Sequence, residues 1–165
     1  MKRIEDLGPG DIVTAISLWE PWASLMATGA KTIETRSWAT GHRGPLLICA
    51  SKRKRVRELR ALLADPAFKR GLAPLVTPGC ADPTIDDLAF GMAVCLVDLR
   101  ICLLSQTISA RIGSCARQDE LHFGDYSHGR FGWVTRHRRR IKPFPVRGEQ
   151  GLFRVQLPQS FEAWS

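Results

Sequence analysis

The short length of its apolar runs is the feature that most constrains how this chain can fold. The clearest run covers residues 91–99, and residues 45–50 are continuously apolar, as expected for a strand buried on both faces. Further runs of strand character cover residues 14–18, 31–36, 130–134 and 151–157. Short strands interrupted by two helices favour a mixed barrel over a parallel sheet with alternating helices. We therefore predict the α+β class, a small mixed β-barrel with flanking helices.

Two segments have the periodicity and the end signals of helices. Residues 20–29 place Pro21 in the first turn, where its missing N–H costs nothing, and Gly29 at the left-handed position that ends a helix. The second helix follows Ser51 as its N-cap. Its apolar stripe consists of Val56, Leu59, Leu62 and Leu63. Residues 66–83 are rich in Pro and Gly, so we expect an irregular segment there, with one helical turn and no functional role.

The net charge of +8 is concentrated in two segments. Residues 31–60 contain nine Lys/Arg and two Glu, a local charge of +7, and residues 136–147 contain six Lys/Arg and no acidic residue, a local charge of +6. The rest of the chain has nine basic and fourteen acidic residues, a charge of −5. Local basic patches are typical of proteins with a polyanionic partner such as a nucleic acid. The alternative is that each run is a solvated face.

The cysteines, histidines and hydropathy argue against several other classes. The five Cys form no C-x-x-C pair and the four His have no metal-ligand spacing, so we expect reduced thiols and no metal or other cofactor. No run approaches the ~18 apolar residues of a membrane helix, and the first six residues are too polar to begin a signal peptide. We expect one domain over residues 1–165, cytoplasmic and without membrane contact.

Four consecutive cations, Lys52, Arg53, Lys54 and Arg55, would crowd the first turn of the second predicted helix. Cations at this positive end of the helix dipole typically cost ~0.3–1 kcal/mol each. A bound phosphate would remove the conflict, because free N–H groups, dipole and side chains would all point at one anion. Screening of the charges by solvent is the alternative. These four residues are therefore candidate binding residues.

The most specific pattern is Gly-Ala-Lys-Thr-Ile-Glu-Thr-Arg at residues 29–36, preceded by Ser-Leu-Trp-Glu-Pro-Trp-Ala at residues 17–23. It resembles the signature of the ASCH family, Gly-x-Lys-Thr-x-Glu-x-Arg. Two later segments are also similar to that family, Gly-Arg-Phe-Gly-Trp at residues 129–133 and Val-Arg-Gly-x-Gln-Gly-Leu-Phe at residues 146–153. The resemblance spans about residues 14–157, in the expected order.

The ASCH family is related to the PUA RNA-binding domains, so the resemblance implies a small PUA-like β-barrel whose signature lines a cleft. Most members are described as binders of RNA or nucleotides. The implied partner is therefore RNA or a modified nucleoside, held in a basic cleft with Lys31 at its lip and Thr32, Glu34 and Arg36 behind it. The transcriptional coactivator that gave the family its name implies a further alternative, a protein-interaction module that docks an acidic partner.

Some small bacterial members of the family are amidohydrolases that remove the acyl group from N4-acylated cytidine without a metal, and others are ribonucleases. By this resemblance Lys31 could act as general acid or base, and Glu34 could orient it or activate water. The amidohydrolases have a nucleophilic threonine where this chain has Glu34, so Thr32 or Thr35 is an alternative nucleophile. Their second carboxylate corresponds best to Glu120, for which a solvated surface position is the alternative.

Aromatic and basic side chains complete the candidate binding residues. Trp19 and Trp38 flank the signature and could stack on a base, an interaction worth ~1–3 kcal/mol per base. Packing in the core is the alternative for both. Tyr126 and Arg130 lie in a Gly-Asp-Tyr-Ser-x-Gly-Arg segment similar to one in the family, where Arg130 could contact a phosphate or pair with Glu34.

The sequence leaves two main functions open, a cleft that only binds RNA or a nucleoside and a hydrolase. A hydrolase needs Lys31 and Glu34 in contact in a solvent-poor pocket, whereas a binding protein needs no perturbed lysine. For Glu34 and Arg36, an ion pair between neighbouring strands is the alternative to a role in the site. We favour the binding function and keep N4-acylcytidine amidohydrolase as the alternative.

Overall fold

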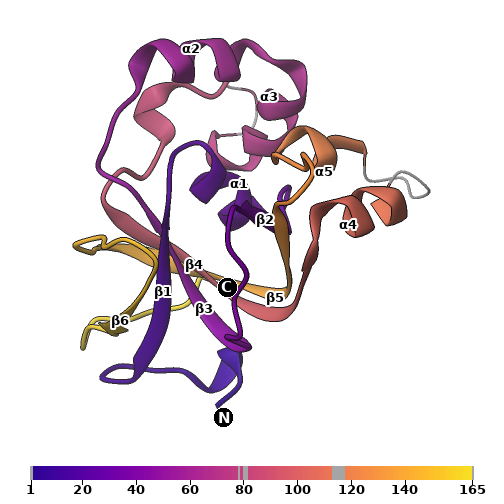
Figure 1. Cartoon of the computed structure of the whole chain (residues 1–165). Coiled ribbons are helices and arrows are strands. Elements are labelled where there is room, and N and C mark those ends of the chain that lie inside the picture. Colours follow the sequence, from indigo (N-terminus) through magenta and orange to yellow (C-terminus); the bar gives the residue numbers. More distant parts are fainter. Residues whose placement is uncertain (1, 78, 80–81, 113–117, 165) are drawn as a thin grey trace.

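The computed structural model describes residues 2–77, 79, 82–112 and 118–164, and its centre is a curled six-stranded sheet (Figure 1). The strands are β1 (Ile12–Leu18), β2 (Ile33–Arg36), β3 (Gly44–Ala50), β4 (Met92–Leu104), β5 (Phe131–Pro145) and β6 (Leu152–Gln156). They pair in the order β2-β5-β4-β3-β1-β6, with β1 and β3 parallel and the other neighbours antiparallel. This mixed, half-open barrel with flanking helices confirms the predicted α+β class.

The α helices gather at one end of the sheet, at the top of Figure 1. They are α1 (Trp22–Thr28), α2 (Val56–Ala64), α3 (Pro66–Leu72), α4 (Ser105–Ile112) and α5 (Gln118–His122), and the short 3-10 helices are η1 (Ile4–Asp6), η2 (Ala73–Leu75) and η3 (Ile85–Asp87). Leu25 of α1, Leu59 of α2 and Phe68 of α3 share one buried cluster, so these helices form one packed layer. In the described parts of the chain, no helix is long and apolar enough to cross a membrane.

The central strand β3 is buried on both faces, as its continuous apolar run predicts. Leu46 and Ile48 belong to the buried cluster on one face, and Leu47 and Cys49 belong to the cluster on the other. Burial also raises the pKa of the Cys49 thiol to about 12, so this cysteine is a packing residue and not a reactive thiol. The two-sided burial fixes β3 in the middle of the sheet.

The first predicted helix is confirmed as α1, with a start two residues later than expected. Gly29 follows it with φ +86°, and its N–H donates to the carbonyl oxygens of Leu25 and Met26. This left-handed position suits glycine, as the sequence predicts. Pro21 stands at the N-cap and not inside the first turn. The turn at Gly29 directs the chain from α1 into the signature.

The prediction that the second helix begins directly after Ser51 is wrong. Helix α2 begins at Val56, with Arg55 as its N-cap, so the cations at residues 52–55 precede the helix and do not form its first turn. The Ser51 N–H donates to the carbonyl oxygen of Leu18, which prolongs the pairing of β3 with β1. This arrangement keeps most of the positive charges out of the helix end that disfavours them.

The segment after α2 is more regular than predicted, because it forms α3. The Asp65 side chain accepts hydrogen bonds from the N–H groups of Ala67 and Phe68, and Pro66 occupies the first helical position. An acidic N-cap followed by proline is a genuine start signal for a helix. The prediction of an irregular segment followed its high Pro and Gly content and did not take this start signal into account. Phe68 is buried in the helical layer.

Strands β4 and β5 extend well beyond the apolar runs that predicted them, to 13 and 15 residues. Their pairing shifts register at three places, and such bulges bend and twist a sheet. Residues 136–145 of the second basic segment therefore lie within β5. Apolar runs do not predict this part of the strand, because its side chains are largely charged. Backbone pairing with β4 does not require apolar side chains.

Candidate ligand-binding site

Lys31 opens the signature and is buried, with 1% of its side chain exposed. Its Nζ donates hydrogen bonds to the carbonyl oxygens of Ile33 (2.5 Å) and Phe123 (3.0 Å) and lies 3.4 Å from Oε2 of Glu34. An ammonium group has three N–H donors, and these three acceptors can use all of them. The prediction that Lys31 lies at the lip of the cleft is therefore wrong.

Glu34 links Lys31 to Arg36 along β2. Its second carboxylate oxygen, Oε1, lies 3.1 Å from Nε of Arg36, and Nη2 of Arg36 donates to the carbonyl oxygen of Ser17 on β1 at 3.0 Å. Residues two apart in a strand project to the same face, which brings Glu34 and Arg36 together. The alternative of an ion pair between neighbouring strands is wrong, because this pair runs along one strand and continues to the buried lysine.

Glu120 of α5 holds the backbone of the signature in place. Its carboxylate accepts hydrogen bonds of 2.9–3.0 Å from the N–H groups of Thr32 and Ile33 and from the hydroxyl of Thr32. Such charge-assisted bonds satisfy backbone donors at an edge of the sheet. Glu120 is 2% exposed, so the alternative of a solvated surface residue is wrong. The contacts make Glu120 a positioning residue for β2, and they turn the Thr32 hydroxyl toward α5.

A cavity of about 790 Å³ lies between the signature strand and the helical layer. Glu34 and Arg36 line it on the side of β2, and Trp22, Leu62 and Phe68 line it on the side of α1, α2 and α3. Small-molecule sites in proteins typically measure ~300–1,000 Å³. The cavity is therefore large enough for a nucleoside.

Trp19 and Trp38 both line the cavity but differ in solvent exposure and in packing. Trp19 is 43% exposed, and the guanidinium of Arg55 lies 4.1 Å from the centre of its ring. Trp38 packs edge-on against the buried Trp133 at 4.6 Å, and its carbonyl oxygen accepts a hydrogen bond from Nε1 of Trp133. Trp19 therefore offers the more accessible ring and Trp38 the more firmly anchored one.

Two ionisable residues that the sequence interpretation missed, Asp65 and His122, also line the cavity. Nε2 of His122 lies 2.9 Å from Oδ2 of Asp65. The hydrogen bond from His122 is the main reason why the pKa of the Asp65 carboxyl is lowered. The one signal that could have pointed to Asp65 is its position before Pro66 as a helix N-cap, whereas His122 carries no local pattern.

Of the two candidates near β5, Arg130 lines the cavity and Tyr126 lies outside the described lining. Nε of Arg130 donates to the carbonyl oxygen of Asp125 at 3.1 Å, and Nη2 donates to that of Thr35 at 3.4 Å. Arg130 thus pairs with Asp125 and not with Glu34. Tyr126 packs in a small cluster beside β2, and burial raises the pKa of its hydroxyl.

The basic residues 52–55 do not act as one group. Arg55 reaches the site through its contact with Trp19. Lys54 lies over the ring of Phe90 at 5.0 Å, which is not among the described lining of the cavity. Arg53 is exposed to solvent, and the stem of Lys52 packs beside the backbone at residue 91.

Part of the second basic segment stabilises the fold. Arg138 donates to the carbonyl oxygen of Ala27 at the end of α1, and Arg139 donates to two carbonyl oxygens near η1 at 2.8 Å each. The guanidinium of Arg140 lies over the ring of Trp164 at 4.9 Å. These contacts support the interpretation of this run as partly structural, against a purely nucleic-acid-binding role.

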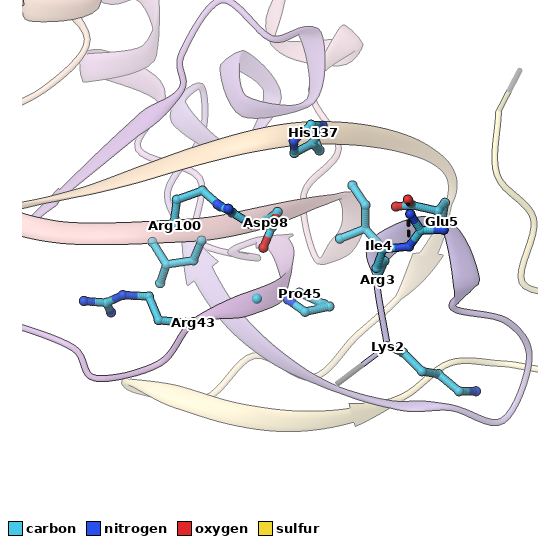
Figure 2. Close-up of a pocket in the computed structure, with 11 residues that line it drawn as sticks. Lys2, Arg3, Ile4, Glu5, Arg43, Pro45, Asp98, Arg100 and His137 are labelled. Atoms are coloured by element: carbon cyan, nitrogen blue, oxygen red, sulfur yellow. Dashed lines mark hydrogen bonds and ion pairs between the residues drawn. The ribbon is translucent and has the colours of Figure 1, made fainter.

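A second cavity, of about 450 Å³, lies near the N-terminal segment and is also rich in cations (Figure 2). Nε of Arg3 lies 3.2 Å from Glu5, Nη1 of Arg100 lies 2.9 Å from Asp98, and Arg43 donates to backbone carbonyl oxygens. These partners neutralise or occupy the cations, and the described lining contains no Phe, Tyr or Trp. The larger cavity is therefore the better candidate site.

Metal ligands do not cluster in the described part of the chain, where no group of three or more His, Cys, Asp or Glu side chains could hold an ion. Cys49, Cys95 and Cys102 are free thiols. Cys80 and Cys115 lie outside the described residues.

The curled mixed sheet, with the signature on an edge strand and helices over one end, defines an α+β fold. Residues 16–141 match the family model of the ASCH domain. The chain therefore belongs to the ASCH family, which confirms the resemblance inferred from the signature.

The chain is also similar to activating signal cointegrator 1 of mouse (Mus musculus), with 46% identity over 57 residues, or 34% of this chain and 10% of the mouse protein. The human (Homo sapiens) protein is 48% identical over 50 residues, 28% of this chain and 9% of that protein. The chain thus matches about a tenth of the length of these relatives. The crystal structure of ASCH from Zymomonas mobilis aligns with 86% of both chains at a TM-score of 0.48 and 15% identity.

Proposed function

We propose that the larger cavity binds a nucleoside-sized ligand, either a free modified nucleoside or one nucleotide of an RNA chain. The observation that carries the proposal is a cavity of about 790 Å³ that combines aromatic walls with a charged floor. Trp19 and Trp38 offer faces on which a base can stack. Membership of a family related to the PUA RNA-binding domains supports the same ligand class.

The charged floor of the cavity, formed by Glu34 and Arg36, suits a base that presents an amine and a carbonyl on one edge. Glu34 lies between Lys31 and Arg36, which places a carboxylate acceptor next to a guanidinium donor. A carboxylate can accept a hydrogen bond from the exocyclic amine of cytosine, and a guanidinium can donate to a base carbonyl. Cytosine, or cytosine modified at its amine, fits this pair of groups.

Two partly exposed cations near the cavity, Arg55 beside Trp19 and Arg130 in the lining, are the candidates for contact with RNA phosphates. Their side chains are 39% and 28% exposed. If RNA is the ligand, each phosphate that such a cation neutralises should add about −0.7 to the slope of log affinity against log salt concentration. A slope near zero would leave the free nucleoside as the ligand.

The binding proposal can be tested by calorimetric titration with cytidine, N4-acetylcytidine and a short single-stranded RNA. Trp19→Ala should weaken binding by ~1–3 kcal/mol, because one stacking surface is lost. Trp164→Ala is the matched control, since Trp164 is similarly exposed but stacks on Arg140 outside the described cavity lining. Equal affinities for both variants, or no binding of any ligand by the wild type, would contradict the proposal.

A second candidate function is hydrolysis of N4-acylated cytidine, and the contact between Lys31 and Glu34 favours it. The two groups lie 3.4 Å apart, and their side chains are 1% and 13% exposed. In this mechanism Glu34 takes a proton from a water molecule whose oxygen bonds to the acyl carbon. The C–N bond then breaks, a proton passes to the leaving nitrogen, and cytidine and the free acid are released. Lys31 holds Glu34 in position and supplies positive charge below the reacting carbonyl group.

The threonines are less suited to act as the nucleophile. The Thr32 hydroxyl bonds to Glu120, and the Thr35 hydroxyl accepts a hydrogen bond from the N–H of Asp125. In this candidate mechanism Glu34, at the position of the nucleophilic threonine of the amidohydrolase relatives, activates water instead of attacking the acyl carbon itself.

Chromatography of cytidine released from N4-acetylcytidine tests the hydrolase. Glu34→Gln should lower the turnover by a factor of about 100 or more, as expected for loss of a general base. Glu162→Gln is the control, because Glu162 is exposed and pairs with Lys142 at the surface. A wild-type protein that binds N4-acylated cytidine and releases no acid from it would rule out this second function and leave the first intact.

A further inference from the structure

The His122–Asp65 pair gives the cavity a titratable group that the proposed function has not used. His122 ends α5 and Asp65 precedes α3, and their side chains are 52% and 32% exposed. Because Nε2 of His122 bonds to Asp65, Nδ1 is the ring nitrogen that can contact a ligand. The rings of Phe68 and Phe123 lie edge-on to the imidazole at 5.9 Å and 6.5 Å, which restricts its orientation.

Without His122, the charges around the cavity cancel. The ionised lining residues are Lys31, Arg36 and Arg130 on one side of the balance and Glu34, Asp65 and Asp125 on the other. Imidazole is the ordinary side chain that changes charge between about pH 5 and about pH 8. In the described lining, His122 is the only histidine, so its protonation changes the net charge from zero to +1.

The other charged groups on α3 and α5 already have partners. Arg70 of α3 pairs with Asp119 of α5 at 3.0 Å, Lys69 pairs with Asp82 at 2.5 Å, and Glu120 bonds to the backbone of the signature. Lys31, which bonds to the carbonyl oxygen of the residue after His122, is also engaged by Glu34. Asp65 is therefore the carboxylate that interacts directly with the imidazole.

We propose that His122, oriented by Asp65, selects ligands that carry a phosphate group, and that this selection strengthens as the imidazole becomes protonated. The inference rests on the proposed nucleoside binding and narrows its ligand class to a nucleotide or an RNA residue. An imidazolium donates a charge-assisted hydrogen bond to a phosphate oxygen. The other cations that line the cavity already pair with carboxylates, so an imidazolium adds attraction for such an anion.

The test compares cytidine with its 5′-methyl phosphodiester by calorimetric titration at about pH 5.5 and about pH 8, on either side of imidazole titration. The phosphodiester carries one negative charge over this whole range, so the ligand does not titrate and the base is the same in both compounds. The preference for the phosphodiester over cytidine should be about tenfold greater at the lower pH, the worth of one charge-assisted hydrogen bond.

Three variants connect this preference to the pair. His122→Gln should give a preference that changes less than about twofold with pH, since it has no group that titrates there. Asp65→Asn should lower the preference, and it keeps a favoured N-cap for α3 because asparagine also accepts hydrogen bonds from helix N–H groups. His128→Gln removes an exposed imidazole outside the described cavity lining and should behave like the wild type.

The outcomes separate the two levels of the proposal. If neither cytidine nor the phosphodiester binds, the proposed function itself fails. If both bind the wild type with a preference that does not change with pH, the role of His122 is refuted while nucleoside binding stands. A pH-dependent preference that persists in a folded His122→Gln variant would also overturn it.

Discussion

The two sides of the cavity are built in different ways. On the side of β2, Lys31 is buried between Glu34 and two backbone carbonyl oxygens, and the buried Glu120 fixes the strand itself. On the helical side the polar groups are partly exposed, and His122 bonds to Asp65, which also caps α3. One side is therefore a fixed frame, and the other faces the solvent.

This difference separates stability from selectivity. A buried charge that loses its partner is expensive, so Lys31 and Glu120 cannot exchange partners with a ligand at low cost. An exposed imidazole can bond to a ligand, because water already competes for it. We therefore expect substitutions of Lys31 and Glu120 to act mainly on the free energy of unfolding, and substitutions of His122 and Asp65 to act mainly on ligand preference.

The largest expected effect follows from removal of the buried lysine. Lys31→Met should lower the free energy of unfolding by roughly 3–5 kcal/mol, because Glu34 and two carbonyl oxygens lose their donor. Lys69→Met is the matched control, since Lys69 pairs with Asp82 at the surface and should change stability by less than about 1 kcal/mol. Urea unfolding of both variants measures the difference. Equal losses would show that Lys31 contributes no more to the free energy of unfolding than a surface lysine.

Removal of the Glu120 carboxylate should have the next largest effect. Glu120→Ala leaves the N–H groups of Thr32 and Ile33 without their acceptor, which should cost roughly 2–4 kcal/mol of stability. Asp119→Ala, one residue earlier on α5, removes only a surface ion pair with Arg70 and should cost less than about 1 kcal/mol. If both variants unfold at the same urea concentration, Glu120 does not fix the strand.

Local patterns in the sequence were sufficient for most of the sheet and for one helix end. Runs of strand character located at least part of every strand, and Gly29 marked the end of α1. The patterns failed where tertiary contacts decide the outcome. The extension of β5 depends on pairing with β4, and the start of α2 depends on the pairing of Ser51 with β1.

The candidate site was predicted on one side only. The signature is contiguous, so residues 31–36 pointed to the β2 side, although nothing local indicated that Lys31 is buried under the segment after α5. The helical side brings Asp65 and Phe68 at the start of α3 together with His122 of α5, and no local pattern marks His122 as part of a site. Such a juxtaposition is a property of the folded chain and has no counterpart in residue spacing.

The buried Glu20 and the partly exposed Asp65 should change stability with pH in opposite directions. Burial raises the pKa of Glu20, so its contribution to stability is present below its unfolded pKa and is lost as the pH rises through the folded pKa. The hydrogen bond from His122 lowers the pKa of Asp65, whose contribution is present above its unfolded pKa and is lost as the pH falls through the folded pKa.

Unfolding from neutral pH to about pH 3 measures both signs, since this range brackets ordinary carboxyl titration. Relative to the wild type, Glu20→Gln should become more destabilising on acidification, and Asp65→Asn should become less so. The Asp65 effect should be the smaller, because solvent screens a partly exposed group. A change of stability in the same direction for both variants would contradict the assigned directions of the two pKa shifts.

The smallest expected effect on stability comes from residues 52–55 of the first basic segment. Arg139 of the second basic segment is the comparison. Replacing Lys52, Arg53, Lys54 and Arg55 by glutamine should lower the free energy of unfolding by about 1 kcal/mol or less, because these residues precede α2 and lose mainly the partly exposed cation–π contacts of Lys54 and Arg55. If RNA is the ligand, the same change should reduce the salt dependence of binding, by ~0.7 in the log–log slope for each lost phosphate contact.

Arg139→Gln provides the opposite case, because Arg139 donates to the carbonyl oxygens of Ile4 and Leu7. It should cost roughly 1–3 kcal/mol of stability, the range for charged hydrogen bonds, and leave the salt slope unchanged. Both quantities can be measured on the same preparations, by urea unfolding and by titration with RNA at several salt concentrations. A stability loss in the 52–55 variant beyond that expected, with an unchanged slope, would mean that these cations serve the fold, and the electrostatic argument for RNA would then rest on Arg130 and the cavity alone.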